Sequence, residues 1–121
     1  MTNRHHTRLG EDGEKLAERF LVGTGMTVVE RRHRTRRGEI DLVCRDGEML
    51  VFVEVKTTQS TGYPEQRIDR AKRRRLTRVA RHYLQHHARI DRVCRFDVLA
   101  VSLGQGGASI EHFQAAFKAL D

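Results

Sequence analysis

The sequence predicts a mixed α/β domain with a central sheet flanked by helices. Three observations lead to this prediction: an amphipathic helical segment precedes three short apolar segments, a long basic helical segment follows them, and another apolar segment returns near the C-terminus. The expected order is helix, three strands, helix, strand, short edge strand and short closing helix. The chain has 121 residues, enough for one domain with its own core. We expect residues 1–9 to be a disordered basic arm and residues 10–121 to be that domain.

The first helix is expected over Glu11–Val22, where apolar residues recur with helical spacing at Leu16, Ala17, Phe20 and Leu21. Gly13 would let this helix approach the sheet closely. Glu14 lies at the edge of the apolar arc, so its carboxylate can reach inward. Glu18 points further out, and we expect it to lie on a solvated acidic face.

Three strands follow, over Met26–Glu30, Glu39–Cys44 and Glu48–Thr57, with the basic run Arg31–Arg37 between the first two. The pair Asp46-Gly47 is a strong signal for a two-residue hairpin turn. The second and third strands should therefore be antiparallel neighbours.

A second, heavily basic helix is expected after the loop-like stretch Gln59–Gly62 and Pro64, and it should extend to about Ala88. Most of its arginines lie opposite an apolar stripe. Lys72 projects towards the sheet instead, so it is either a phosphate-facing cation or a lysine whose stem packs inward while its ammonium reaches solvent.

The C-terminal part is expected to contain a strand over Val93–Leu103, an edge strand over Ile110–Phe113 and a short helix over Gln114–Leu120. Phe117 of this helix would fill the core.

The composition points to a polyanionic partner. Lys and Arg total 23 against 16 Asp and Glu, giving a net charge of +7 and an isoelectric point near 10.2, so nucleic acid is the favoured partner.

No segment is apolar enough to be a membrane span or a signal peptide. Cys44 and Cys94 lack metal-ligand spacing and read as buried thiols, which favours a cytoplasmic protein. We do not expect His82, His86 and His87 to bind zinc.

The chemistry is expected at Asp41, Glu54 and Lys56, three ionisable residues inside otherwise apolar strands. Side-chain alternation places Glu54 and Lys56 on one face, and the hairpin brings Asp41 to meet them. Paired carboxylates in such a place favour Mg²⁺, with Mn²⁺ as an alternative, and Lys56 could hold a phosphate oxygen or steer an attacking water. The other interpretation is a structural Glu54–Lys56 pair at a strand end.

These residues resemble the PD-(D/E)XK, or restriction-endonuclease-like, nucleases, and their arrangement is similar to the archaeal Holliday-junction resolvases. From about Gly10 to Phe117 the chain is more specifically similar to the YraN family of bacterial proteins. The shared motifs are G-E-x-x-A from Gly13, R-x-R-x-x-x-G-E-I-D-L from Arg32 to Leu42, F-V-E-V-K ending at Lys56, Lys72 itself and R-F-D-V from Arg95. The chain has Arg32 where family members often have Asn, and Thr58 where many have Arg.

The resemblance implies a restriction-endonuclease-like fold and a metal site. Asp41, Glu54 and the Val55 carbonyl would bind the ion, Lys56 would orient the nucleophile, and Glu14 would complete the acidic cluster. Glu39 belongs to the YraN pattern and shares a strand face with Asp41, and its role is open.

The leading hypothesis is a Mg²⁺-dependent nuclease that hydrolyses phosphodiester bonds in DNA, including branched or damaged DNA. Contacts to phosphates are expected from six basic residues: Arg34, Arg36, Arg37, Lys72, Arg74 and Arg78. Cutting two strands would require a homodimer. The second hypothesis is a non-catalytic nucleic-acid-binding module of the same fold that acts in recombination or repair. The third takes Asp41, Glu54 and Lys56 as a structural polar network.

Overall fold

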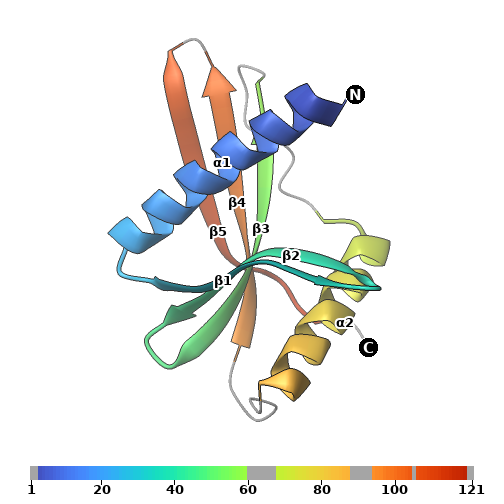
Figure 1. The fold of residues 1–121 in the computed structure, drawn as a ribbon. Coiled ribbons are helices and arrows are strands. Elements are labelled where there is room, and N and C mark those ends of the chain that lie inside the picture. The colour runs from blue at the N-terminus through green and yellow to red at the C-terminus, as the bar shows by residue number, and fades with distance from the viewer. Residues whose placement is uncertain (1–2, 60–67, 88–93, 105, 120–121) are drawn as a thin grey trace.

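The computed structural model describes residues 3–59, 68–87, 94–104 and 106–119. Its elements are, in order, α1 (Asn3–Gly23), β1 (Thr27–Thr35), β2 (Gly38–Asp46), β3 (Met49–Thr58), α2 (Arg70–His86), β4 (Cys94–Gly104) and β5 (Gly107–Phe117). The strands form one sheet in the order β1-β2-β3-β4-β5 (Figure 1). Only the β3–β4 pair is parallel among these neighbours, and α2 lies in the connection between the two. The predicted mixed α/β class is confirmed.

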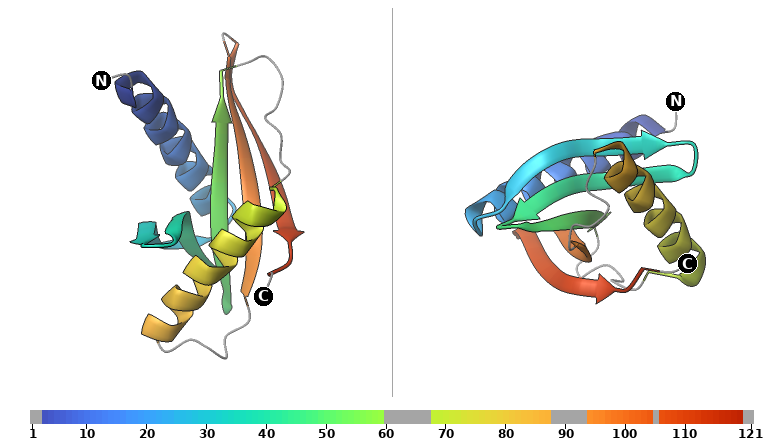
Figure 2. Two further views of the ribbon diagram at one scale, coloured as in Figure 1. Left: turned by 90° about the vertical axis from the view of Figure 1, so that its right-hand side faces the viewer. Right: turned by 90° about the horizontal axis from the view of Figure 1, so that it is seen from below.

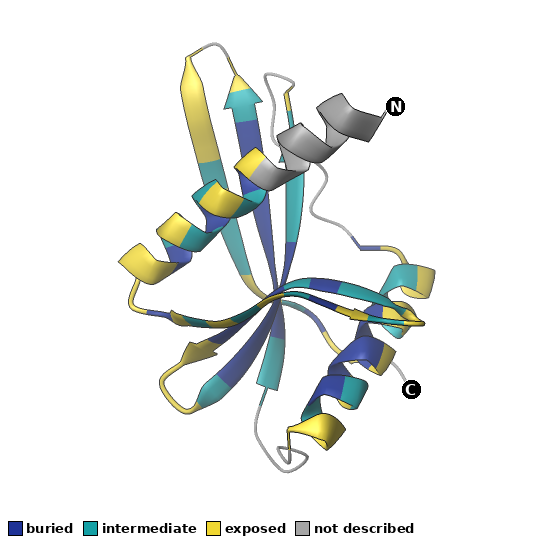
Figure 3. Cartoon of the chain, in the orientation of Figure 1, coloured by how far each residue is buried: buried dark blue, intermediate teal, exposed yellow. Residues whose placement is uncertain are grey.

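The two helices pack on apolar side chains from opposite faces of the sheet. Alternate strand residues face α1, where Ala17 and Leu21 pack with Leu42, Val51, Val53, Leu99 and Val101. The intervening residues face α2, where Leu76, Val79 and Tyr83 pack with Val43, Phe52, Phe96 and Val98. Figure 3 shows the buried positions along the centres of the strands and on the inner sides of both helices. Each fully buried side chain of this kind stabilises the fold by about 1.5–3 kcal/mol.

The β2–β3 hairpin forms as predicted, with its turn one residue later. Asp46 is still paired, with Met49, so the two turn residues are Gly47 and Glu48. Gly47 has a φ of 64°, a left-handed conformation that glycine adopts at little cost.

The sheet opens where β2 leaves β3. The paired register between these strands runs from Asp46–Met49 to Leu42–Val53 and ends there. Beyond this point β1 and β2 curl out of the plane of β3, β4 and β5 (Figure 2). The residues before Leu42 and after Val53 therefore border a fork in the sheet.

The first strand is longer than predicted. We expected it to end at Glu30, but β1 continues to Thr35 and takes in most of the basic run. His33 in this part of β1 is buried. Side chains in a strand alternate in direction, so arginines can occupy one side while His33 faces inward, and a run of charges hides the strand signal.

Both helices start at positions other than those expected. α1 begins at Asn3, before the expected start at Glu11, and so includes residues 3–9, for which we expected a disordered arm. A formed helix extends readily into polar residues when no proline stops it. α2 begins at Arg70, because the Asp69 carboxylate accepts the Lys72 N–H at 2.8 Å and caps the helix. Pro64, residues 60–62 of the expected loop and Ala88 lie outside the described residues.

The predicted closing helix is wrong, because β5 continues to Phe117. The reason is a bulge: Ala115 has a φ of 50°, and its N–H donates to the Asp97 carboxylate at 2.9 Å. The bulge lets the strand resume with Phe117 opposite Phe96. The two rings stack at 4.8 Å, so Phe117 fills the core as expected.

Asp97 is a fully buried carboxylate that ties β4 to β5. Its oxygens accept hydrogen bonds from Arg95 Nε at 2.9 Å and from the Ala115 N–H, and lie 2.7 Å from His112 Nε2. Burial alone would raise the pKa of Asp97, but these bonds hold it below its ordinary value. The network is saturated and holds the bulge.

Both cysteines are free thiols, Cys44 buried and Cys94 partly buried. Burial raises the pKa of Cys44 to about 12. Among the described residues, no helix combines the length and apolar character needed to cross a bilayer.

Gly13→Ala is expected to lower stability by about 1–3 kcal/mol, because a new methyl group has no room against the sheet. A Cβ at this position would lie 2.1 Å from Thr57 Oγ1 and 3.0 Å from Thr57 Cβ. Urea unfolding measures the change. The control is Gly23→Ala, where a Cβ would meet nothing within 4 Å. Equal stability of the two variants would contradict the close approach of α1 to β3.

Candidate acidic site

The fork between β2 and β3 is closed by the side chain of Asp41. The main-chain pairing between β2 and β3 ends at Leu42–Val53, so the Val55 N–H of β3 has no main-chain partner on β2. Asp41 Oδ2 accepts this N–H, from Val55, at 2.7 Å. The carboxylate is thereby fixed at the point where the sheet opens.

Two further carboxylates converge on Asp41. Glu14 comes from α1, Glu39 comes from the start of β2, and one oxygen of each lies within 4.8 Å of the others and of an Asp41 oxygen. Glu39 and Asp41 point the same way because they are two residues apart on a strand. Glu14 reaches the group because Gly13 brings α1 against Thr57 of β3. We call Glu14, Glu39 and Asp41 the acidic group.

Cations of the chain compensate the carboxylates around Asp41. Arg32 Nε donates to Glu14 at 3.0 Å, and Arg34 Nε donates to Glu39 at 2.8 Å. Glu54 of β3 is also near Asp41; it is buried, and its Oε2 lies 2.6 Å from Lys72 Nζ of α2. Three neighbouring carboxylates therefore each have a cation.

Among the described residues, the Asp41 carboxylate accepts a hydrogen bond from the Val55 N–H and has no cation within ion-pair distance. Burial, then the charge of Glu54, and to a lesser degree those of Glu14 and Glu39, raise the pKa of Asp41 to about 8, although the Val55 N–H lowers it. The Asp41 carboxylate would gain most from a bound cation. The donors are all hard oxygens, as Mg²⁺, Mn²⁺ and Ca²⁺ require.

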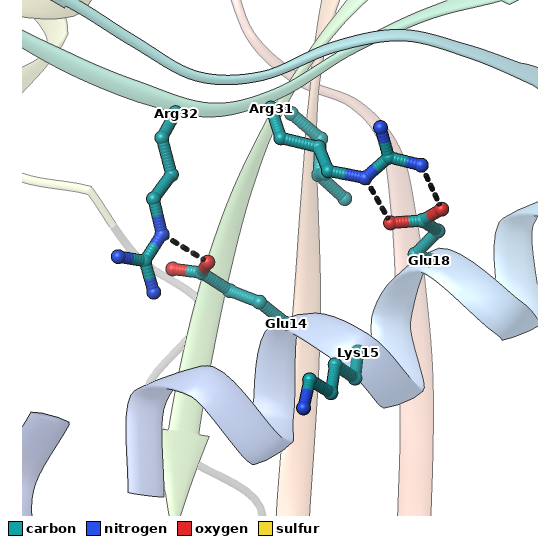
Figure 4. Close-up of a pocket in the computed structure, with 6 residues that line it drawn as sticks. Glu14, Lys15, Glu18, Arg31 and Arg32 are labelled. Carbon is teal, nitrogen blue, oxygen red and sulfur yellow. Dashed lines mark hydrogen bonds and ion pairs between the residues drawn. The ribbon is translucent and has the colours of Figure 1, made fainter. Parts of the chain in front are cut away.

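A pocket of about 340 Å³ adjoins the acidic group. Its lining includes Glu14, Glu18, Arg31 and Arg32, together with Lys15 and Leu42. Figure 4 shows Glu14 reaching from α1 towards Arg32 and Glu18 forming a two-point contact with Arg31. The Arg31 Nε to Glu18 Oε1 distance is 2.8 Å. Glu18 is thus held by β1 and does not lie on a simple solvated face. The Arg31 guanidinium also lowers the pKa of Glu18.

Arg32 has an unusual backbone. Its φ of 52° is left-handed, a conformation that costs a residue with a side chain roughly 1–2 kcal/mol. The β1–β2 register places it between the pairs Arg31–Leu42 and His33–Ile40, opposite Asp41. The strain therefore falls beside the acidic group.

Comparison with known proteins identifies the family. The model of the uncharacterised protein family UPF0102 matches residues 13–101, which contain every carboxylate described above. The chain belongs to the UPF0102 family. It is 48% identical over 111 residues to a UPF0102 protein of Anaeromyxobacter dehalogenans, covering 90% of this chain and 83% of that protein. It is 41% identical over 116 residues to one of Rhodococcus opacus, covering 93% and 98%.

In this UPF0102 protein the predicted site residues are brought together only in part. Glu14 and Asp41 meet in the acidic group, whereas the predicted ligand Glu54 is close enough to raise the pKa of Asp41 but pairs with Lys72. Lys56 is half-buried on β3, two residues beyond Glu54, so alternation places both on one face.

The predicted phosphate contacts divide into two sets. Arg34 and Lys72 pair with Glu39 and Glu54. Arg36 and Arg37 are exposed at the β1–β2 turn, and Arg78 is exposed on α2 while Arg74 is partly so. The second set is the one that presents guanidinium groups outward.

For Glu39 and Lys72 the sequence predicted the direction of the side chain but not its role. Strand alternation placed Glu39 beside Asp41, and the helical wheel turned Lys72 towards the sheet. Neither pattern identifies the partner. The Lys72–Glu54 pair requires α2 to cross β3 at one particular height, which depends on tertiary packing.

Asp41→Asn is expected to stabilise the metal-free protein at pH 8. The folded pKa of about 8 lies above the ordinary 3.8, so between these values the folded state binds a proton that the unfolded state lacks, and stability falls as pH rises. Asn is neutral and keeps an oxygen for the Val55 N–H. We expect a gain of roughly 1–4 kcal/mol at pH 8, and a smaller one at pH 5, from thermal unfolding in EDTA. A destabilised variant at pH 8 would instead make Asp41 a purely structural group.

Proposed function

We propose that this UPF0102 protein is a cation-dependent nuclease of the PD-(D/E)XK type that hydrolyses phosphodiester bonds in DNA. The observation that carries the proposal is Asp41, a carboxylate fixed at a fork in the sheet, surrounded by three others and without a cation within ion-pair distance among the described residues. Carboxylates in structural networks normally have compensating partners, whereas carboxylates with a strongly raised pKa and no cation beside them are typical of functional sites.

The cation in this proposal is Mg²⁺, with Mn²⁺ as the alternative, because the donors are hard carboxylate oxygens. The acidic group supplies oxygens from α1 and β2, and Glu54 supplies a carboxylate from β3 once Lys72 releases it. Bound there, the ion would polarise a phosphate oxygen and help to ionise water. The proposed ligands are Asp41, Glu54 and the Val55 carbonyl.

The chain's own residues would position the substrate. The Val55 N–H holds Asp41 in one orientation, and Arg32 and Arg34 hold Glu14 and Glu39 in place. Lys56 would orient the attacking water, and its ammonium would stabilise negative charge that develops on phosphate oxygens. Outward-facing arginines would bind the flanking phosphates. These contacts carry no base code, so recognition would follow DNA shape, such as branched or damaged DNA.

The described part of one chain contains one such centre, so cutting both strands of a duplex or a junction would use a homodimer. A DNA substrate together with the two free thiols fits a cytoplasmic protein.

One observation favours a second function, a non-catalytic nucleic-acid-binding module acting in recombination or repair. The Lys72–Glu54, Arg32–Glu14 and Arg34–Glu39 pairs compensate three carboxylates without any ion. In this alternative the basic surface binds and the acidic group only maintains the fold.

Glu54→Gln is expected to reduce cleavage by at least about 100-fold while leaving DNA binding within about threefold, because the lost charge contributes to the transition state and faces no flanking phosphate. Mg²⁺ and Mn²⁺ binding is measured by calorimetry. Cleavage is followed on labelled duplex, single-stranded and four-way-junction DNA. Glu48→Gln, exposed at the β2–β3 turn, is the matched control.

Cation binding and cleavage that are both lost in Glu54→Gln and kept in Glu48→Gln would establish the nuclease. Equal cleavage by purified wild type and Glu54→Gln would reject the assignment of Glu54. DNA binding without cation binding or cleavage would favour the non-catalytic module.

Lys72→Met is expected to tighten Mn²⁺ binding several-fold, because the Lys72 ammonium and the cation compete for Glu54. Without a cation the variant should be less stable than wild type, since a buried carboxylate loses its partner. Calorimetric Mn²⁺ titrations and melting temperatures with and without Mn²⁺ test both effects. Lys118→Met removes the same charge at an exposed position after β5. Weaker Mn²⁺ binding in Lys72→Met than in Lys118→Met would contradict the competition.

A further inference from the structure

A second pocket, of about 530 Å³, lies between the β1–β2 turn and α2. It is lined by Arg37 of the turn and by Arg78, Arg81, His82 and Gln85 of α2. The four α2 residues have the spacing i, i+3, i+4 and i+7, so they share one face of the helix. All five side chains can donate hydrogen bonds, and no carboxylate is among the described residues that line the pocket.

The walls of this pocket are held close together. Gly38 lies against α2, where a Cβ would meet Arg75 Cγ at 3.3 Å and Val79 Cγ2 at 3.6 Å. The Arg37 N–H donates to Thr35 Oγ1 at 3.0 Å, which fixes the turn backbone. The Arg37 guanidinium is therefore presented from a backbone of defined geometry, and the pocket does not depend on a loose loop.

The charges in the pocket favour an anion. Three guanidinium groups face one small volume, and like charges at these helical spacings repel each other. Arg31, Arg32 and Arg34 of β1 each have a carboxylate partner. In contrast, the guanidinium groups of Arg37 and Arg78 have no carboxylate partner among the described residues. His82 Nδ1 adds a second indication, because it is buried and has no hydrogen-bond partner among the described residues.

We propose that the pocket formed by Arg37, Arg78, Arg81, His82 and Gln85 is a phosphate-binding subsite for a nucleic acid strand. The planar fork of a guanidinium donates two parallel hydrogen bonds to phosphate oxygens. Neighbouring arginines therefore bind a phosphate group in preference to a neutral, apolar ligand. The inference rests on the proposed function for its ligand. It adds Arg81, His82 and Gln85 to the residues expected to contact the substrate.

The subsite is separate from the acidic group and within reach of the same strand. Lys72, which pairs with Glu54, precedes Arg78 by six residues and Arg81 by nine along α2. At a rise of 1.5 Å per residue these positions lie about 9 and 14 Å further along the helix. A strand that advances about 3.4 Å per nucleotide would span this distance with about three to four nucleotides.

Oligonucleotide binding in EDTA tests the subsite without any cleavage. Arg37→Gln and Arg78→Gln are each expected to weaken binding of a fluorescent 12-nucleotide single strand about three- to tenfold. Each should also lower the number of ions released on binding, measured as the slope of the logarithm of the binding constant against the logarithm of the salt concentration, by about one. Arg45→Gln is the control: it removes the same charge from an exposed position on β2, seven residues and about 23 Å from Gly38. Thermal unfolding confirms that all three variants fold.

Inorganic phosphate provides an independent measurement. In wild-type protein the side-chain Nε–H resonances of Arg37 and Arg78 should shift saturably as phosphate is added, while that of Arg45 should not. If Arg45→Gln weakens oligonucleotide binding as much as Arg37→Gln and Arg78→Gln do, or if no resonance shifts saturably, the subsite is rejected.

The outcomes separate this inference from the proposed function. DNA cleavage by wild type, with all three arginine variants binding equally, would overturn the subsite and leave the nuclease intact. Loss of cleavage in Glu54→Gln with the pocket effects unchanged would support both. Saturable phosphate shifts in a protein that binds no oligonucleotide would overturn nucleic acid as the ligand of the pocket.

Discussion

The partly buried Asp41 carboxylate at the fork between β2 and β3 is the interaction on which the rest of the site depends. Its oxygen replaces the main-chain partner that the Val55 N–H loses when β2 turns away. A hydroxyl or amide could also accept this N–H, so the hydrogen bond alone does not require a charge. The charge instead costs stability, because burial and neighbouring carboxylates oppose it. A group that supports the fold as an acceptor and opposes it as an anion is best explained by a ligand that compensates the anion.

The surrounding architecture serves to concentrate this charge. Gly13 lets α1 lie against Thr57, which brings Glu14 to Asp41, and the strained backbone of Arg32 places a guanidinium opposite both. Each outer carboxylate then has its own cation, so repulsion is reduced everywhere except at the centre. Such a pattern differs from a closed network like that of Asp97, where Arg95, His112 and a backbone N–H satisfy the carboxylate completely and lower its pKa. Among the described residues, Asp97 is thus a buried carboxylate with all its partners, whereas Asp41 is partly buried and has no cation within ion-pair distance.

The sequence predicted what depends on local pattern. Alternating apolar residues predicted β2, β3 and β4, and the Asp46-Gly47 pair predicted the β2–β3 turn to within one residue. Helical periodicity predicted that the side chains of Glu14 and Lys72 point inward. The sequence failed where a distant partner decides the local structure. β5 continues past Phe113 because Asp97, on another strand, accepts the Ala115 N–H. β1 continues through the basic run, in which Arg31, Arg32 and Arg34 reach acidic residues of α1 and β2. Glu54 was correctly placed near Asp41, but its pairing with Lys72 depends on where α2 crosses the sheet.

The net charge of +7 consequently overstates the surface available to a polyanion. Several arginines that composition assigns to nucleic acid are committed to carboxylates of the chain, and an exposed phosphate would have to compete with those partners. The electrostatic attraction that remains comes from the β1–β2 turn and from the outer face of α2, where the described lining of the pocket between them contains no carboxylate. Because counterion release counts only the cations that exchange salt ions for phosphates, internally paired arginines contribute little to it. The same chain thus uses arginine in two ways: on β1 to assemble an acidic centre, and at the turn and on α2 to present positive charge beside it.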